Sequence, residues 1–259
     1  MKTIPSSALV GMISMYLLTG CSVKEDRGLC PCRLMLDFSE VDTSVIRYAD
    51  LFVEAGDGAV FTMHLEPDDL REILAVDVPK GEINLGIWNG TDMMEDGGGV
   101  RISYGDDCPP VYFHTSSLAA DEDYVHEVVR MRKNHCVMTL DMDWGGTEIE
   151  EVAIIGNVDG YSADGSPAEG GFSYEPEIRD GCNCRVVLPR QIDDSLVLEV
   201  SDSSGILKRF ALGEYIAASG YDWSEPDLKD ITIEMDLAVL RISVTVQGWD
   251  ATHRFDVVI

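Results

Sequence analysis

The seven cysteines have the most varied chemistry of any residue type in this chain of 259 residues. After Cys21 come Cys30, Cys32, Cys108, Cys136, Cys182 and Cys184. In an exported protein these thiols can form disulfides, and the sequence leaves their pairing open. The two Cys-x-Cys pairs could instead bind zinc, but zinc ligands usually have Cys-x2-Cys spacing and these pairs lie far apart. We therefore expect disulfides or inert buried thiols, and neither a metal nor a cofactor.

Residue types that serve catalysis are present but scattered. The five histidines are His64, His114, His126, His135 and His253. The chain has no Gly-x-Ser-x-Gly or His-Glu-x-x-His motif, which would bring a nucleophile or a metal ligand together with its base. Neighbouring acids such as Asp106 and Asp107 are expected by chance in so acidic a chain, whereas a glycosidase needs two carboxylates at a defined distance. The sequence therefore predicts that the protein is not an enzyme.

Two further kinds of binding site have weak support. Oxygen ligands for calcium could come from Asp92, Glu95 and Asp96, or from Asn157, Asp159 and Asp164. Neither set has the EF-hand order, so solvated loops are the better interpretation. The four tryptophans, Trp88, Trp144, Trp223 and Trp249, could form a sugar-stacking platform with Tyr104 and Tyr112. For Trp88 and Trp249, packing in a core or at a domain junction is the more usual role.

The amino-terminal segment has the pattern of an export signal. Lys2 precedes an uncharged, largely apolar run over residues 8–18, which suits a signal-peptide core and is short for a bilayer span. The sequence Leu17-Leu18-Thr19-Gly20-Cys21 resembles a bacterial lipobox. This resemblance implies cleavage before Cys21 and acylation, for example by palmitate, of its thiol and its new amino group. The alternative is an ordinary secretory signal in which the cysteine is incidental.

The residues after the lipobox resemble sorting signals. Ser22 at this position resembles an outer-membrane signal, and Lys24, Glu25 and Asp26 resemble the lysine-plus-two-acids signal for surface export in Bacteroidetes-type bacteria. Several acyl chains on one residue hold a protein to a membrane far better than one chain. We therefore expect residues 1–20 to be a signal peptide and residues 21–29 a lipidated tether. The resemblance implies anchoring in the outer membrane, with the protein exposed at the cell surface.

The charge of the chain excludes some partners. The formal net charge is −28. A field this negative argues against nucleic acid, which binds basic surfaces, and keeps the protein body off anionic lipids. Disorder is not expected, because the acidic residues alternate with apolar ones.

Apolar residues alternate with polar ones along most of the chain, which predicts strands. The expected strands are 34–38, 50–55, 59–65, 83–87, 124–131, 136–142, 185–188, 195–200, 206–210, 231–237, 240–246 and 255–259. Short helical segments are expected at 67–74 and from Leu212 to a stop at Gly220, with loops at 92–110 and 157–171. Such a pattern favours an all-β fold of antiparallel sandwiches. A polar break after Arg130 predicts two domains, residues 30–133 and 134–259.

Four stretches together resemble a known family. Cys21 is followed by Cys30-Pro31-Cys32 and a strand, and residues 78–89 read Val-Pro-Lys-Gly-Glu-Ile-Asn-Leu-Gly-Ile-Trp-Asn. Residues 212–223 contain a short helix and a Gly-Tyr-Asp-Trp loop, and residues 230–237 precede a strand that reaches Trp249. In this order they resemble the fimbrillin-associated anchor lipoproteins of Bacteroidetes type V pili.

The resemblance implies two transthyretin-like β-sandwiches in tandem, at the base of a fimbrium in the outer membrane. It also implies a stalk pilin as partner, bound by β-strand complementation, and no small-molecule substrate. In that mode, backbone hydrogen bonds at a sheet edge give affinity and side-chain pockets give specificity. The alternative is a glycan-binding surface lipoprotein in cell adhesion. Exposed aromatics on one face would favour the alternative, and an exposed apolar edge strand would favour the pilus anchor.

Overall fold

The computed structural model describes residues 30–56, 58–90, 99–146, 149–178, 183–202, 205–236, 239 and 241–256. The predicted signal peptide and tether, with Cys21, Ser22, Lys24, Glu25 and Asp26, lie outside these residues, as do Cys182 and the candidate calcium ligands Asp92, Glu95 and Asp96. Within the described ranges, no helix combines the length and the apolar character needed to cross a bilayer.

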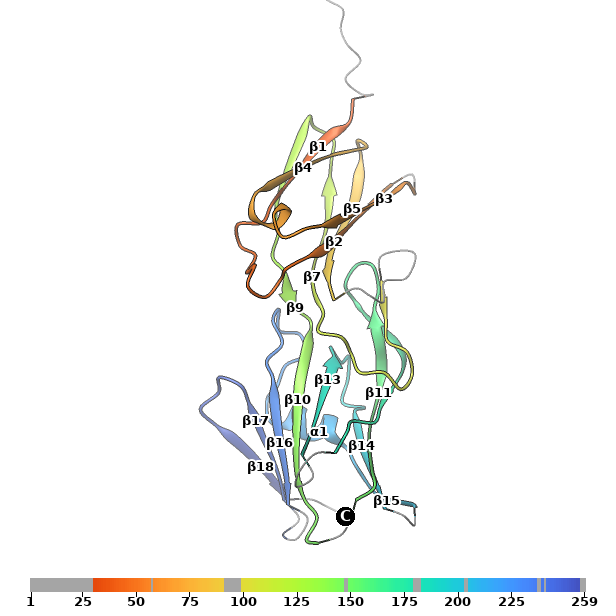
Figure 1. The fold of residues 1–259 in the computed structure, drawn as a ribbon, viewed down its shortest axis with the longest axis vertical. Coiled ribbons are helices and arrows are strands. Elements are labelled where there is room, and N and C mark those ends of the chain that lie inside the picture. The colour runs from red at the N-terminus through yellow and green to blue at the C-terminus, as the bar shows by residue number, and fades with distance from the viewer. Residues whose placement is uncertain are drawn as a thin grey trace, which may run out of the picture.

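The first part of the chain forms two facing sheets, here called the N-terminal sandwich (Figure 1). One sheet has the order β4-β1-β8, with β1 (Cys32–Asp37), β4 (Ile73–Val78) and β8 (Tyr124–Val128). The other has the order β3-β2-β5-β7-β9, with β2 (Ala49–Ala55), β3 (Val60–Leu65), β5 (Glu82–Asn89), β7 (Tyr112–Ala119) and β9 (Arg132–Lys133). Alternation puts Leu34 and Leu36 of one sheet, and Ile83, Leu85 and Ile87 of the other, into one buried core.

The second part forms the C-terminal sandwich. One sheet has the order β13-β10-β16-β17-β18, with β10 (His135–Asp143), β13 (Asn183–Pro189), β16 (Ile231–Asp236), β17 (Arg241–Val246) and β18 (Thr252–Asp256). The other has the order β12-β11-β14-β15, with β11 (Glu151–Tyr161), β12 (Pro167–Tyr174), β14 (Val197–Asp202) and β15 (Gly205–Phe210). Short β6 (Val100–Arg101) pairs with the far end of β11. The inward residues of both sheets, such as Met138, Leu140, Ile154 and Leu198, share one core.

The two sandwiches repeat one topology, which the weak similarity of their sequences did not establish. In each, the first strand lies between an antiparallel partner (β4 or β13) and a parallel one (β8 or β16). The opposite sheets, β3-β2-β5-β7 and β12-β11-β14-β15, also correspond strand by strand in chain order. The all-β prediction is confirmed, and the described strands pair in an antiparallel way except at these two parallel pairs.

The helical segments are shorter than expected. The segment 67–74 contains only a 3-10 turn, η2 (Asp69–Arg71), because β4 begins at Ile73. Helix α1 (Leu212–Ala218) is followed by Gly220 at φ 85°, the left-handed conformation expected for its stop. The loop predicted at 157–171 is wrong, since this segment contains the end of β11 and the start of β12.

Candidate functional site

The chain passes from the N-terminal to the C-terminal sandwich through β9, Asn134 and the start of β10, here called the crossing segment. Strand β9 pairs with the start of β7, placing Lys133 beside Tyr112, and β10 begins two residues later. The Asn134 N–H donates to the carbonyl oxygen of Val111 at 3.0 Å. The Nδ1 atom of buried His135 lies 3.1 Å from the same oxygen. The crossing segment is therefore fixed to the N-terminal sandwich up to the point where it enters the C-terminal one.

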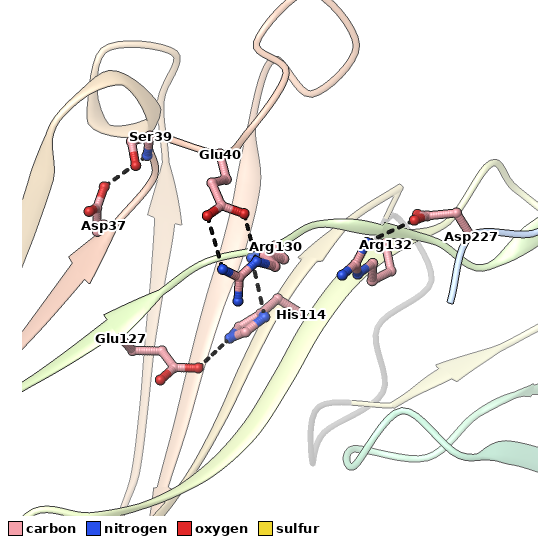
Figure 2. A network of polar contacts seen from close by, with 8 residues as sticks. All are labelled: Asp37, Ser39, Glu40, His114, Glu127, Arg130, Arg132 and Asp227. Atoms are coloured by element: carbon pink, nitrogen blue, oxygen red, sulfur yellow. Dashed lines mark hydrogen bonds and ion pairs between the residues drawn. The ribbon is translucent and has the colours of Figure 1, made fainter. Parts of the chain in front are cut away.

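Polar side chains surround this crossing segment (Figure 2). The Arg130 guanidinium donates two hydrogen bonds to Glu40, at 2.6 and 2.9 Å, and Arg132 pairs with Asp227 at 2.9 Å. The Arg130 N–H points at Nδ1 of His114, at 3.3 Å, so Nδ1 is the acceptor nitrogen and Nε2 donates to Glu127 at 3.0 Å. Burial lowers the pKa of His114, which favours this neutral tautomer. The ion pairs of Arg130 and Arg132 are about half exposed and thus contribute little stability.

A second cluster of polar side chains at the junction is more deeply buried than the ion pairs of Arg130 and Arg132. The Tyr161 hydroxyl donates to the carbonyl oxygen of Asn134 and accepts the N–H of Arg190 at 2.7 Å. The Arg190 guanidinium also donates to Oδ1 of Asn134 at 2.8 Å. Asp230 accepts the Val137 N–H at 2.9 Å and pairs with the Lys133 ammonium. These bonds connect β9 and β10 to β11, to the segment after β13 and to the segment before β16.

An aromatic stack joins the outer face of the N-terminal sandwich to the C-terminal core. Trp88 is fully buried, and its ring centroid lies 4.4 Å from that of Phe113, which in turn meets the Tyr161 ring edge-on at 5.3 Å. Both Trp88 and Phe113 belong to the buried cluster of the C-terminal sandwich. The β11–β12 hairpin closes over this stack, and the Thr115 hydroxyl donates to the carbonyl oxygen of Asp164 at 3.0 Å. The two sandwiches therefore share a packed interface.

Strand β3 is an open edge of its sheet. Among the strands that the structure describes, it pairs only with β2. Because the Ala55 N–H donates to the Ala59 carbonyl oxygen, alternation along the strand turns the peptide groups of Val60, Thr62 and His64 away from β2. The side chains of Val60 and Phe61 are 55% and 38% exposed. Every other strand that ends a sheet in the described ranges carries at least one acidic or basic residue, whereas β3 has none of Asp, Glu, Lys or Arg. Since charges normally protect such edges, β3 is the best candidate for adding a strand.

The candidate cysteines that the structure describes do not gather at one site. Cys32, Cys108 and Cys136 are buried free thiols, and Cys30 is an exposed one. Cys32 lies in the N-terminal core and Cys184 in the C-terminal core, so the two Cys-x-Cys pairs cannot share a zinc ion. Burial raises the pKa of Cys136 to about 12, as expected for an inert thiol.

The other candidate ligands have separate partners. Asn157 donates to Asp193 at 2.9 Å, and Asp159 pairs with Arg101. Among the described residues, no three His, Cys, Asp or Glu side chains gather as metal ligands. The tryptophans form no exposed platform, because Trp88 and Trp144 are buried and Trp223 and Trp249 are partly buried against the C-terminal core. Trp88 and Trp144 are therefore not available to stack on a sugar, whereas Tyr104 is 80% exposed.

The residues of the candidate site that the sequence did not reveal lie mainly at the junction. Arg190, Tyr161 and Asp230 had no motif that marked them, and the polar sequence of β7 gave no strand signal. The alternation within β3 was visible, but only the sheet order shows that this strand is an edge.

Comparison with known proteins places the fold. Neither a family model nor a curated protein matches the sequence. The fimbrial anchor protein Mfa2 from Porphyromonas gingivalis is similar in structure, with a TM-score of 0.60 and 14% identity over 85% of this chain and 98% of that one. A proposed polysaccharide-binding protein from Bacteroides thetaiotaomicron is also similar, with a TM-score of 0.63 and 15% identity over 87% of this chain and 98% of that one. A proposed adhesin from Bacteroides ovatus has a TM-score of 0.61 and 12% identity over 88% of this chain and 96% of that one. The resemblance to fimbrial anchor proteins that the sequence suggested is thus confirmed at the level of the fold, which this chain shares with Mfa2 across both sandwiches.

Proposed function

We propose that the protein is a non-enzymatic anchor or assembly subunit of a fimbrium at the cell surface. The similarity to Mfa2 extends over both sandwiches and nearly the whole of that chain, as expected if the two proteins share an architecture for one task. The repeated strand order, with one parallel pair in each sandwich, suits two transthyretin-like domains in tandem. In this proposal Cys21 carries the acyl chains that hold the protein in the outer membrane.

The observation that carries the proposal is the open edge of β3, a strand with none of Asp, Glu, Lys or Arg. An incoming strand of the stalk pilin would hydrogen-bond to the outward peptide groups of Val60, Thr62 and His64. Exposed Val60 and Phe61 lie on opposite faces of the strand, so each offers apolar contact to an alternating side chain of the partner. A pilin segment that adds here needs alternating apolar residues and no dense negative charge, since this chain carries a formal charge of −28.

Two edge variants test this mode of binding. Val60→Lys puts a charge on the proposed docking edge, and Ile73→Lys does the same at the edge strand β4 of the other sheet, where Ile73 is 51% exposed. Thr62→Pro removes an outward N–H while leaving the β2–β3 hydrogen bonds intact. We expect Val60→Lys and Thr62→Pro to weaken binding of purified stalk pilin about tenfold or more, and Ile73→Lys to leave it unchanged. If all three variants bind the stalk pilin equally well, the β3 edge is excluded as the binding site for the pilin strand.

The cellular role has its own experiments. Deleting the protein should release fimbriae from the cells or change their length, and Cys21→Ala should release the protein from the outer membrane. Fimbriae that stay attached and of normal length would contradict the anchoring role, and a membrane-bound Cys21→Ala protein would contradict the lipid anchor.

A further inference from the structure

A cavity of about 380 Å³ at the junction has a basic lining. Arginine side chains reach it from both sandwiches, because Arg130 and Arg132 come from the chain around β9 and Arg190 follows β13. Within the described ranges no Asp or Glu lines this cavity, although the chain has 47 acidic residues and only 19 Lys and Arg. The cavity is therefore a basic site in a strongly acidic protein, which favours anionic ligands there.

The Arg190 guanidinium has no carboxylate partner in the part of the chain that the structure describes. It donates to neutral acceptors, which are the carbonyl oxygens of Trp223 and Glu225, the latter at 2.9 Å, and Oδ1 of Asn134 at 2.8 Å. Asp222 interacts electrostatically with this charge but forms no ion pair with it among the described residues. The Nε–H of this partly buried arginine has no acceptor there either, and Nε is not closed off from solvent. One positive charge of the site thus lacks a counter-ion, which is unusual for a buried arginine.

The other two guanidinium groups are neutralised by acids that do not line the cavity (Figure 2). Glu40 accepts from Nε and Nη2 of Arg130, and Asp227 accepts from Nη1 of Arg132. Nη1 of Arg130, and Nε and Nη2 of Arg132, therefore have no acceptor among the described residues. Both side chains are about half exposed. The cavity thus combines unused guanidinium donors with one uncompensated charge.

This arrangement suits a single carboxylate group. A guanidinium presents two parallel N–H donors to a carboxylate, and neighbouring guanidinium groups can share its oxygens. The uncompensated charge of Arg190 matches the single charge of a carboxylate, whereas a phosphate dianion would add further negative charge to a chain of formal charge −28. A cation would meet three arginines, and a neutral ligand would leave Arg190 without a counter-ion.

We propose that this cavity binds the carboxylate of a peptide segment from a partner protein. Its volume of about 380 Å³ is small for a ligand pocket, which suits one side chain with its neighbouring peptide group. Phe113 and Pro226 line the cavity and offer apolar contact to the aliphatic part of such a residue. The carboxylate can belong to an Asp or Glu side chain or to a carboxyl terminus, because guanidinium groups bind the same two oxygens in each. The site is distinct from the β3 edge and does not depend on the fimbrial role.

The Nε–H of Arg190 gives a direct readout. In the ¹⁵N-labelled protein its resonance is assigned through the bonds to its own backbone. N-acetylglycine carries a terminal carboxylate and N-acetylaspartate methylamide a side-chain carboxylate, and each has a neutral amide counterpart as its control. Each compound is titrated to concentrations well above millimolar at constant ionic strength. At least one carboxylate is expected to shift the Arg190 resonance in a saturable way, and its neutral counterpart to leave the resonance in place.

Arginine variants locate the binding site. Arg132→Gln removes a half-exposed guanidinium of the cavity and should weaken carboxylate binding about tenfold. Arg190→Lys keeps the charge but loses the guanidinium fork, and it should weaken binding by a similar factor. Arg33→Gln is the matched control, because Arg33 is 62% exposed and pairs with Asp77 outside the cavity, and it should leave the affinity unchanged. The comparison of Arg132→Gln with Arg33→Gln leaves the hydrogen bonds of Arg190 in place, so it decides the matter even if Arg190→Lys is unstable.

Three outcomes would overturn the proposal. One is that no carboxylate shifts the Arg190 resonance while the near-ultraviolet circular dichroism shows an intact fold. Another is that inorganic phosphate or glucuronate shifts it and neither peptide carboxylate does, which would make the cavity a site for another class of anion. The third is that Arg132→Gln and Arg33→Gln bind the carboxylate equally well.

Discussion

Acidification should destabilise the junction between the sandwiches through His135. This side chain is only 3% exposed, its Nδ1 lies 3.1 Å from the Val111 carbonyl oxygen, and its ring meets that of Tyr112 edge-on at 5.1 Å. Burial lowers the pKa of His135 from 6.5 to about 4, helped by the positive charges of Lys133 and Arg185. The hydrogen bond to Val111 and the charge of Asp230 oppose this shift without cancelling it. The folded protein thus holds a neutral imidazole where the unfolded chain would protonate it.

The sign and size of the effect follow from proton linkage. Because the pKa is lower in the folded state, the unfolded chain binds the proton first as the pH falls. The stability associated with a neutral His135 is complete above a pH of about 6.5 and is lost as the pH falls toward about 4. At a pH of about 5 the loss from this one group is about 2 kcal/mol.

Urea unfolding of paired variants measures this contribution. The free energy of unfolding is compared between wild type and His135→Gln, at a pH of about 8 and of about 5. Titration of the many carboxylates, and of His114, affects both proteins and cancels in the difference. The wild type should lose about 2 kcal/mol more than His135→Gln on acidification. The matched control is His126→Gln, since His126 is 45% exposed. An equal loss in wild type and His135→Gln, or a His126→Gln protein that behaves like His135→Gln, would refute the reasoning.

Three further perturbations have clear expectations. Gly160→Ala should destabilise the fold by about 3 kcal/mol in urea unfolding, because φ at Gly160 is 152° and the new Cβ would lie 1.9 Å from the Val100 carbonyl oxygen of β6. A loss below about 1 kcal/mol would show instead that β6 can move away from the new Cβ. Asp230→Ala should lower the free energy of unfolding by about 2 kcal/mol, because the Val137 N–H loses its acceptor. Glu40→Ala, at an exposed ion pair, should leave the urea midpoint nearly unchanged. A larger loss of stability in Glu40→Ala than in Asp230→Ala would contradict this reasoning. In thiol labelling of the folded protein, exposed Cys30 should react with maleimide at once and buried Cys136 only on unfolding, so equal rates would contradict the burial of Cys136.

Alternation in the sequence predicted the strands whose two faces differ most. Strand β16 has buried apolar residues on one face and polar ones on the other, and β5 has the same pattern from Glu82 to Leu85, so the alternation alone located them. Strand β7 was missed because its centre reads His-Thr-Ser-Ser, with polar residues on both faces. Residues 157–171, at the end of β11 and the start of β12, have the composition of a loop, rich in Gly, Ser, Asp and Pro. Those glycines instead allow close approach, since a Cβ on Gly170 would lie within 2.4 Å of the Asp159 carboxylate.

The junction shows where sequence reasoning reaches its limit. The expectation that Trp88 packs in a core or at a domain junction is confirmed. Its large apolar ring at the end of a strand favours burial against a neighbouring element. The hydrogen bond from Val137 to Asp230 joins residues 93 positions apart, and nothing local marks either residue. Such long-range pairs become visible only when the strand order is known.

The parallel pairing of β1 with β8 has a mechanical consequence. Arg33 lies beside Tyr124 and Asp37 beside Val128, so the two strands run in the same direction along the N-terminal sandwich. Tension applied at Cys32 and at Val129 would pull these strands past each other lengthwise. All the hydrogen bonds between them would then share the load in shear, whereas a hairpin pulled at its open end breaks one bond at a time. A molecule loaded from its first strand would therefore resist extension through this pair.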